Sequence, residues 1–220
     1  MARATRTEIL MKRSFGVGAV ALLATLVLGI GCSKKRVEAA PRAASTDNVA
    51  QFYPLAVGNR WTYRLNGIAN KQVTVEVLKQ EEGYFLDNQN GQLAVDAYGL
   101  RDAKRYLLRG PLEVGHSWTN VVSVSSTERY RIVGVGVTCQ APAGTFQGCV
   151  QVEGRNRMDA NATLVNTMSF APGVGIVRLD IAVEGKDGQR TPQVLMELTG
   201  WRLSDGQGGG RPAAEPAPAG

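Results

Sequence analysis

Hydrophobic and polar residues alternate with a period of two along most of residues 51–203. In the clearest segment, 72–77, three valines alternate with Gln, Thr and Glu. Such alternation is typical of half-buried β-strands, whose successive side chains point to opposite faces. Asn-Gly pairs and a Lys186-Asp187-Gly188 tip supply turns between the runs. The pattern predicts strands at 61–65, 73–77, 84–86, 93–95, 117–125, 128–139, 146–157, 163–170, 176–183 and 192–203.

No window sustains an amphipathic helix of useful length. The nearest is 100–108, where Leu100, Ala103 and Leu107 would share a helical face. A short helix there therefore stays open as an alternative to a strand or loop. About 150 residues are enough for one domain with a real core, so the sequence predicts a single all-β domain over residues 51–203.

The first 31 residues have a different pattern, that of a secretory signal. Lys12 and Arg13 precede an uncharged run, 15–30, that is rich in Val, Leu, Ala and Gly. Such a run closing on small residues is typical of a cleaved signal peptide rather than a permanent membrane span. We predict a signal peptide over residues 1–31, with Met11 as the natural start. An uncleaved anchor helix is the alternative.

The signal ends at Gly31-Cys32, and this junction resembles the lipobox of bacterial lipoproteins. In such proteins signal peptidase cuts before the cysteine, whose thiol then carries diacylglycerol. The resemblance implies lipidation of Cys32, with this diacylglycerol and an acyl chain as covalent groups, no other cofactor, and the membrane as a partner. Ser33 is not the aspartate associated with inner-membrane retention. This favours the cell envelope, at the outer membrane facing the periplasm.

Residues 32–50 and 204–220 predict a flexible tether and a disordered tail, because both are small, polar or rich in Gly and Pro. The tether begins with Lys34, Lys35 and Arg36, which either contact anionic headgroups or stay solvated. Loss of the signal removes four basic residues and one acidic residue, which lowers the net charge from +6 to +3. Nucleic-acid binding requires a concentrated basic surface, so we expect no nucleic-acid partner.

The densest basic cluster of the domain is Arg101, Lys104, Arg105 and Arg109. It either faces headgroups or a polyanion, or forms a charged sheet edge that deters aggregation.

Cys139 and Cys149 remain as an even pair if Cys32 carries lipid, and an exported protein works in an oxidising compartment. Turn residues at 140–145 favour a hairpin between them. Direct pairing would place Val137 opposite Gln151 unless a β-bulge shifts the register. Both outcomes stay open: a disulfide, or two reduced and half-buried thiols.

Nine residues, 54–62, recur at 111–119 with six identical positions. In each copy Pro and Gly predict a turn, Leu and Val are expected to face inward, and Trp is expected to anchor the following strand in the core. A ligand-stacking role is the alternative for the tryptophans. The predicted turn and anchor residues are Pro54, Gly58, Trp61, Pro111, Gly115 and Trp118.

The residues offer little chemistry. The single histidine, His116, takes the place of Asn59 in the repeated segment, so a polar turn residue explains it. A Ser-His-Asp site would need this imidazole, and the sequence has no Gly-x-Ser-x-Gly elbow. It also lacks a phosphate-binding loop and a usual set of zinc ligands, and no spacing selects a carboxylate pair. We expect no catalytic residue and no metal site.

Two further motifs are Pro142-Ala143-Gly144-Thr145-Phe146 with Cys149-Val150, and the segment 170–177. They resemble the paired signatures of uncharacterised bacterial envelope proteins called TapB-like. The opening of that family matches Tyr53-Pro54-Leu55, Val57-Gly58 and Trp61. The resemblance spans residues 52–203 and implies a single antiparallel, strongly curved sheet or half-barrel. It carries over no catalytic residue.

These observations favour a lipid-anchored, non-enzymatic envelope protein that acts as an interaction or scaffold module for another envelope protein. The alternative is a carrier or sensor that holds a hydrophobic ligand inside the curved sheet. A carrier needs an apolar cavity of at least about 300 Å³. A core filled by Trp61, Trp118 and Trp201 would remove that space.

Overall fold

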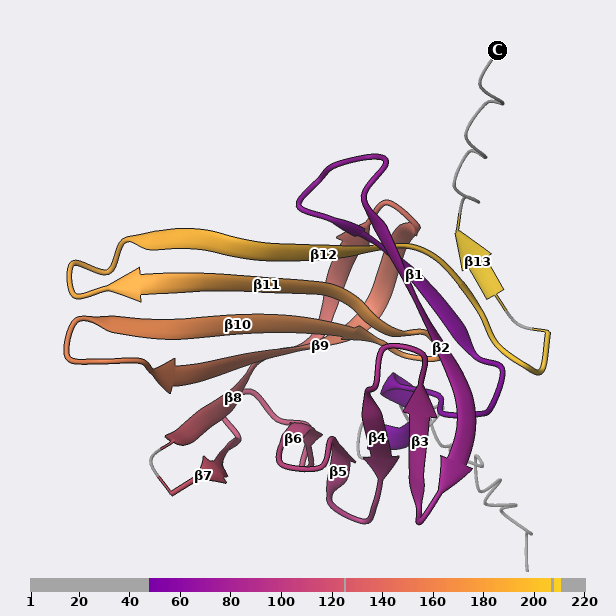
Figure 1. Cartoon of the computed structure of the whole chain (residues 1–220), viewed down its shortest axis with the longest axis horizontal. Helices are drawn as coiled ribbons and strands as arrows, with labels where there is room; N and C mark the ends of the chain where they lie inside the picture. The colour runs from indigo at the N-terminus through magenta and orange to yellow at the C-terminus, as the bar shows by residue number, and fades with distance from the viewer. Residues whose placement is uncertain (1–47, 125, 207, 211–220) are drawn as a thin grey trace, which may run out of the picture. The chain divides into compact units, whose positions relative to one another are not determined.

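The computed structural model describes residues 48–124, 126–206 and 208–210. The predicted signal peptide, Cys32, the tether before residue 48 and residues 211–220 lie outside the described residues. Within them the chain forms one antiparallel sheet (Figure 1). A 3-10 turn, η1 (Val49–Phe52), precedes the strands: β1 (Arg60–Leu65), β2 (Gln72–Glu81), β3 (Tyr84–Asp87), β4 (Gln92–Val95), β5 (Gly99–Arg101), β6 (Tyr106–Arg109), β7 (Ser117–Ser123), β8 (Ser126–Ala141), β9 (Gly144–Arg157), β10 (Ala162–Ala171), β11 (Gly175–Gly185), β12 (Arg190–Arg202) and β13 (Gly208–Gly210).

The strand order is β6-β5-β4-β3-β2-β1-β12-β11-β10-β9-β8-β7, with β13 on β12. Sequence neighbours other than β6 and β7 pair as hairpins, and the pairing of β1 with β12 joins the two halves of the chain. In Figure 1 the ribbons of β9–β12 run side by side, and β1 and β2 cross their direction. The prediction of an all-β, antiparallel, strongly curved sheet is confirmed.

Alternation along the strands separates an inner from an outer face. In β8, Glu128, Tyr130 and Ile132 are buried, whereas Arg129 and Arg131 between them are exposed. The inner faces meet in one hydrophobic cluster. Its largest fully buried apolar side chains are Trp61, Phe52, Phe170, Leu100, Leu108, Ile132 and Leu198.

The repeated nine-residue segment forms the same turn twice. The Gly58 N–H donates to Val77 O in the first copy, and the Gly115 N–H donates to Ile132 O in the second, at 2.9 and 2.8 Å. Both glycines have positive φ, +90° and +94°, which L side chains rarely adopt. The expectation for the two valines was wrong, because Val57 and Val114 are exposed at the turn surface.

Other boundaries also differ from the sequence prediction. The segment 100–108 forms β5 and β6 rather than a short helix. The folded part begins before residue 51, because Val49 is buried in η1. It also extends past Leu203, since β13 pairs with the end of β12. A Cβ on Gly209 would lie 2.4 Å from the Trp201 ring, so glycine lets this strand approach.

Candidate functional site

The predicted anchor residues lie in the core. Trp61 is 0% exposed and Trp118 is 5% exposed. The Trp61 ring stacks on Tyr53, and its Nε1–H donates to Val174 O at 2.6 Å. Trp118 stacks on Tyr130 with ring centroids 5.7 Å apart. The two tryptophans therefore belong to one hydrophobic cluster, and each packs against a different tyrosine.

Pro54 and Pro111 open the two turns at unequal exposure: Pro54 is half-buried, and Pro111 is exposed. The backbone of both prolines accepts a hydrogen bond within its turn. Pro54 O accepts from the side chain of Asn59, and Pro111 O accepts from the Glu113 N–H. These residues shape the turns and contribute no reactive group.

Cys139 and Cys149 form a disulfide across the β8–β9 hairpin. The two residues are not directly opposite, since Cys139 pairs with Phe146 and Cys149 with Val137. Register shifts between Val135 and Cys139 bring about this arrangement. The bulge that the alternation pattern required is thus present on β8.

The two end strands of the sheet, β6 and β7, meet through side chains rather than through a ladder. The Tyr106 N–H donates to Asn120 Oδ1 at 3.0 Å, and Asn120 Nδ2 donates back to Tyr106 O at 3.2 Å. Trp118 Nε1 also donates to Tyr106 O, at 2.8 Å. The buried Asn120 amide therefore does what a backbone peptide group does in a ladder.

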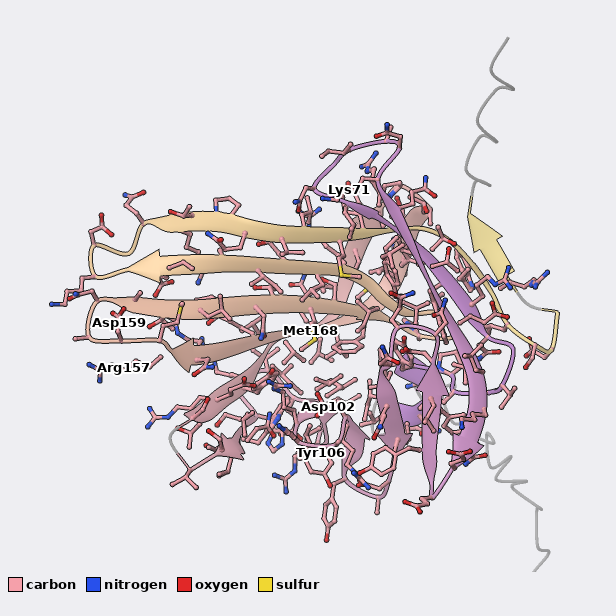
Figure 2. The ribbon with its side chains drawn as sticks, in the orientation of Figure 1. Lys71, Asp102, Tyr106, Arg157, Asp159 and Met168 are labelled. Atoms are coloured by element: carbon pink, nitrogen blue, oxygen red, sulfur yellow. A yellow bond between two sulfur atoms is a disulfide. The ribbon has the colours of Figure 1, made fainter. Side chains whose placement is uncertain are left out.

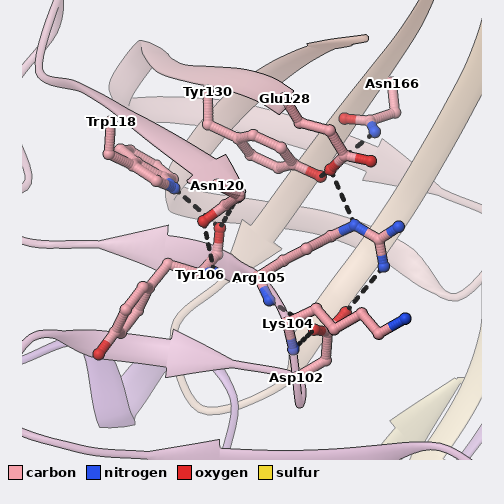
Figure 3. Close-up of polar contacts among 9 residues, drawn as sticks. All are labelled: Asp102, Lys104, Arg105, Tyr106, Trp118, Asn120, Glu128, Tyr130 and Asn166. Atoms are coloured by element: carbon pink, nitrogen blue, oxygen red, sulfur yellow. Dashed lines mark hydrogen bonds and ion pairs between the residues drawn. The ribbon is translucent and has the colours of Figure 1, made fainter. Parts of the chain in front are cut away.

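A polar cluster lies beside this seam (Figure 3). Arg105 Nε donates to Glu128 Oε2 at 2.8 Å, and Arg105 also pairs with Asp102. The Glu128 side chain is only 8% exposed. Tyr130 OH donates to the same carboxylate at 3.1 Å, and Asn166 Nδ2 donates to Tyr130 OH at 3.4 Å. The cluster thereby links β5–β6 to the inner face of β8–β10.

Burial and hydrogen bonding shift the pKa values of two members of this cluster, Tyr130 and Arg105. Desolvation raises the pKa of Tyr130 to about 12, with the Glu128 carboxylate adding to the rise. The hydrogen bond to Glu128 and the nearby charges raise the pKa of Arg105 despite its partial burial. Tyr130 therefore stays protonated and Arg105 charged at neutral pH, so neither group can serve as a general base. This cluster is a structural connection.

A pocket of about 310 Å³ opens on the outer face of β7–β9. Arg129 faces Thr119 on β7 and Arg155 on β9, and Arg131 faces Ser117 and Glu153 in the next row. The lining residues are Ser117, Trp118, Thr119, Arg129, Tyr130, Arg131, Glu153 and Arg155. The pocket thus combines three guanidinium groups, the hydroxyls of Ser117 and Thr119 and one carboxylate with two aromatic residues, Trp118 and Tyr130.

The charges of this pocket are unequally compensated. Arg155 pairs with Glu153 and Glu184, and Arg190 bridges the same two carboxylates. These hydrogen bonds from Arg155 and Arg190 lower the pKa of Glu184. Among the described residues neither Arg129 nor Arg131 has an ion-pair partner, and Arg129 lies directly opposite the like-charged Arg155. Like charges in direct cross-strand pairs are destabilising.

The basic cluster noted in the sequence does not form a free patch. Arg101 pairs with Asp96, and Arg105 pairs with Glu128 and Asp102. The Arg109 guanidinium lies over the rings of Tyr98 and Tyr106, at 5.7 and 5.4 Å. Its three arginines are therefore held by side chains of the β4–β6 region and, for Arg105, also by Glu128 of β8.

His116 lies next to Trp118, with ring centroids 5.8 Å apart, and its buried Nε2 has no hydrogen-bond partner in the described part of the chain. No group of three or more His, Cys, Asp or Glu side chains that could hold a metal ion occurs among the described residues. Among them there is also no helix long and apolar enough to cross a membrane.

Sequence reasoning missed the pocket and the seam. Arg129 and Arg131 were visible as outward positions of a strand, but their surroundings depend on which strands flank β8. Asn120 and Glu128 carried a stronger signal, because both occupy the inward phase of an alternating strand, where a polar residue needs a partner.

No family model and no curated protein matches this chain. Among solved structures it is similar to a Bacteroides fragilis protein named as exported and as having a YmcC-like fold. The two share 13% identity over 69% of this chain and 99% of the other, with a TM-score of 0.39. A Parabacteroides distasonis protein named as a lipoprotein is similar at 11% identity over 67% of this chain and 96% of its own, with a TM-score of 0.33. Likenesses of this size do not indicate what the chain binds.

Proposed function

We propose that this chain is a lipid-anchored, non-enzymatic envelope protein whose β domain is an interaction module. Its outer-face pocket on β7–β9 takes an anionic group of another envelope component. The observation that carries this proposal is that Arg129 and Arg131, in a pocket of about 310 Å³, have no ion-pair partner among the described residues, although Arg131 lies opposite Glu153. An anion there would relieve the repulsion between Arg129 and Arg155.

Guanidinium groups suit such a ligand. Each presents a planar fork of donors that matches a carboxylate or phosphate, and the hydroxyls of Ser117 and Thr119 add further donors. Because the pocket is open to solvent, a bound anionic group can remain part of a larger molecule, as binding by an interaction module requires.

The packed interior favours a module over a carrier of hydrophobic ligands. Trp61 and Trp118 fill the inner face, and Trp201 packs edge-on against Phe146 with ring centroids 5.6 Å apart. The pocket itself lies on the opposite, outer face. A ligand held there would contact arginine stems and hydroxyls together with Trp118 and Tyr130, which also line the pocket.

The anchor is tested by mass analysis of the mature N-terminus. The expected species begins at Cys32 and carries diacylglycerol and an acyl chain. The Cys32→Ser variant should be released from the membrane fraction. Retention of that variant at the wild-type level, or an unprocessed N-terminus in the cytosol, would overturn the proposal.

The pocket is tested with a photo-crosslinking amino acid in place of Thr119 in the full-length protein. We expect a discrete crosslinked product in cells that Arg129→Gln with Arg131→Gln strongly reduces. Arg157→Gln is a matched control, because Arg157 is an exposed β9 arginine outside the pocket. Equal crosslinking in all three backgrounds would rule the pocket out as the binding surface.

A further inference from the structure

The tip of the β7–β8 hairpin is apolar and exposed. Val121 is 69% exposed and Val124 is fully exposed, and Val122 stands between them in the sequence. Two other long hairpins carry charged residues at their ends: β11–β12 turns through Lys186-Asp187-Gly188, and Arg157 and Asp159 flank the exposed Met158 at the end of β9–β10 (Figure 2). Single exposed valines need no explanation, but two within four residues at a hairpin tip, beside the half-buried Val122, do.

Cationic side chains follow directly behind this tip. Arg129 is three residues along β8 from Ser126 and Arg131 is five, so they lie about 10 and 17 Å from the tip at 3.3 Å per residue. The outward positions of β7 and β8 from Ser117 to Arg131 include no carboxylate. The only acidic residue of the hairpin, Glu128, is buried and bonded to Arg105.

We infer that this hairpin docks on the membrane that holds the lipid anchor, with the valines at the acyl boundary and the two arginines among lipid phosphates. The inference rests on the proposed function, because the anchor brings the domain to that membrane. It makes anionic lipid headgroups the occupants of the pocket.

The spacing between the tip valines and the two arginines matches the thickness of the headgroup region of a bilayer. The headgroup region of each leaflet is roughly 5–8 Å thick, as the difference between a hydrocarbon core and a whole bilayer indicates. Interfacial elements bury their apolar side about 5–10 Å deep. With the valines at that depth, Arg129 lies at phosphate level. Arg131 reaches the same level with its long side chain, since arginine stems extend toward a polar boundary.

The tether allows this contact. The folded chain begins at η1, where Val49 Cγ2 lies 4.0 Å from the Cβ position of Gly110, seven residues before β7. From Ser117 the seven residues of β7 extend about 23 Å to the tip. If the segment is the flexible tether that the sequence predicts, the 16 residue steps from Cys32 to Asn48 would span roughly 20–24 Å. The lipid and the hairpin tip can therefore reach one bilayer surface together.

Charge and size favour a membrane over a second copy of the chain. Twofold pairing of two such hairpins would bring Arg129 and Arg131 close to their own copies, which repels. The tip is also far smaller than the roughly 800 Å² per partner that a stable protein interface buries. An anionic lipid surface, in contrast, complements both the arginines and the valines.

The test uses the mature, acylated protein with Val124→Cys labelled by an environment-sensitive fluorophore. With Cys32 acylated and Cys139 bonded to Cys149, the new cysteine is the one free thiol. Lys186→Cys on the β11–β12 tip is the matched control. In vesicles of phosphatidylcholine with phosphatidylglycerol, the label at 124 should shift to the blue and be quenched by nitroxide lipids, whereas the label at 186 should not. Val121→Cys gives a second position in case one label perturbs the tip.

Removing the arginines should weaken docking. Each of Arg129→Gln and Arg131→Gln should lower the inserted fraction about fivefold. The reason is that one basic residue near an anionic membrane contributes about 1 kcal/mol of attraction, which corresponds to this factor. Flotation of the protein with the vesicles reports the lipid anchor separately. If the protein floats while the label at 124 stays as exposed as that at 186, the hairpin inference fails and the anchor stands. A blue shift that needs no vesicles and grows with protein concentration would assign the tip to a second copy and also overturn the inference.

Discussion

Replacement of Asn120 by alanine should open the seam between β6 and β7. In the structure this amide accepts from the Tyr106 N–H and donates to the Tyr106 carbonyl, at 3.0 and 3.2 Å. Alanine removes both bonds. Trp118 Nε1 still satisfies the carbonyl, so the Tyr106 N–H is the group left without a partner.

The expected cost follows from those contacts. A lost net hydrogen bond costs about 1 kcal/mol, and a buried donor left unsatisfied costs about 1–3 kcal/mol. Because the carbonyl keeps one bond, we expect a loss of about 2–3 kcal/mol in the free energy of unfolding. With a urea m-value of about 2 kcal/mol/M, the unfolding midpoint should fall by about 1–1.5 M.

Urea unfolding followed by tryptophan fluorescence measures this midpoint, and amide hydrogen exchange locates the loss. Exchange should accelerate in β5 and β6 before the strands β9–β12. Thr119→Ala is the matched control, because its side chain is exposed on the other face of the same strand, and it should change stability by less than about 0.5 kcal/mol. If Asn120→Ala unfolds at the same urea concentration as Thr119→Ala, side-chain closure of the seam is refuted.

Three further outcomes are expected. Gly154→Ala places a Cβ 2.8 Å from the Tyr130 ring, and such overpacking should lower thermal stability by about 1–3 kcal/mol in calorimetry. Cys139→Ser removes the disulfide to Cys149, which joins residues 10 apart in the sequence. The free energy of unfolding in urea should fall by about 2 kcal/mol, and reductant should not change the stability of the variant. Although burial opposes it, hydrogen bonds from backbone and side chains lower the pKa of Asp96. Asp96→Asn should therefore destabilise the protein at neutral pH, and its difference from wild type should vanish as the pH falls through that lowered pKa.

The strand pattern was predictable from the sequence because most pairs in this sheet are hairpins. Period-two alternation identifies each strand, and turn residues such as Asn66-Gly67 connect it to its neighbour. The alternation even indicated that β8 needs a bulge near the cysteines. Its position could not be predicted, because it depends on Gly136 taking a φ of +71° within a strand.

The closure of the sheet could not be predicted in the same way. Arg105 lies in the loop between β5 and β6, and Glu128 lies on β8, near the other end of the sheet. Their contact depends on how far all intervening strands curve. Periodicity gives the face on which Glu128 lies but not the partner that it meets there. The β13 strand was missed for another reason: a run of glycines has low strand propensity, and only packing against Trp201 favours it.

The two copies of the repeated segment explain why the second hairpin is the better candidate for function. In the first copy β1 lies between β12 and β2, and buried Asn59 bonds to Pro54 O and to the Ser204 N–H. In the second copy β7 ends the sheet, and the corresponding His116 leaves Nε2 without a described partner. The same turn therefore begins two hairpins: β1–β2, which has neighbouring strands on both sides, and β7–β8, which projects from the end of the sheet. The turn is structural in both places, and the difference lies in the residues after it. Of the two hairpins, β7–β8 carries the exposed Val121 and Val124 and two arginines without an ion-pair partner among the described residues, whereas the β1 arginines, Arg60 and Arg64, are paired.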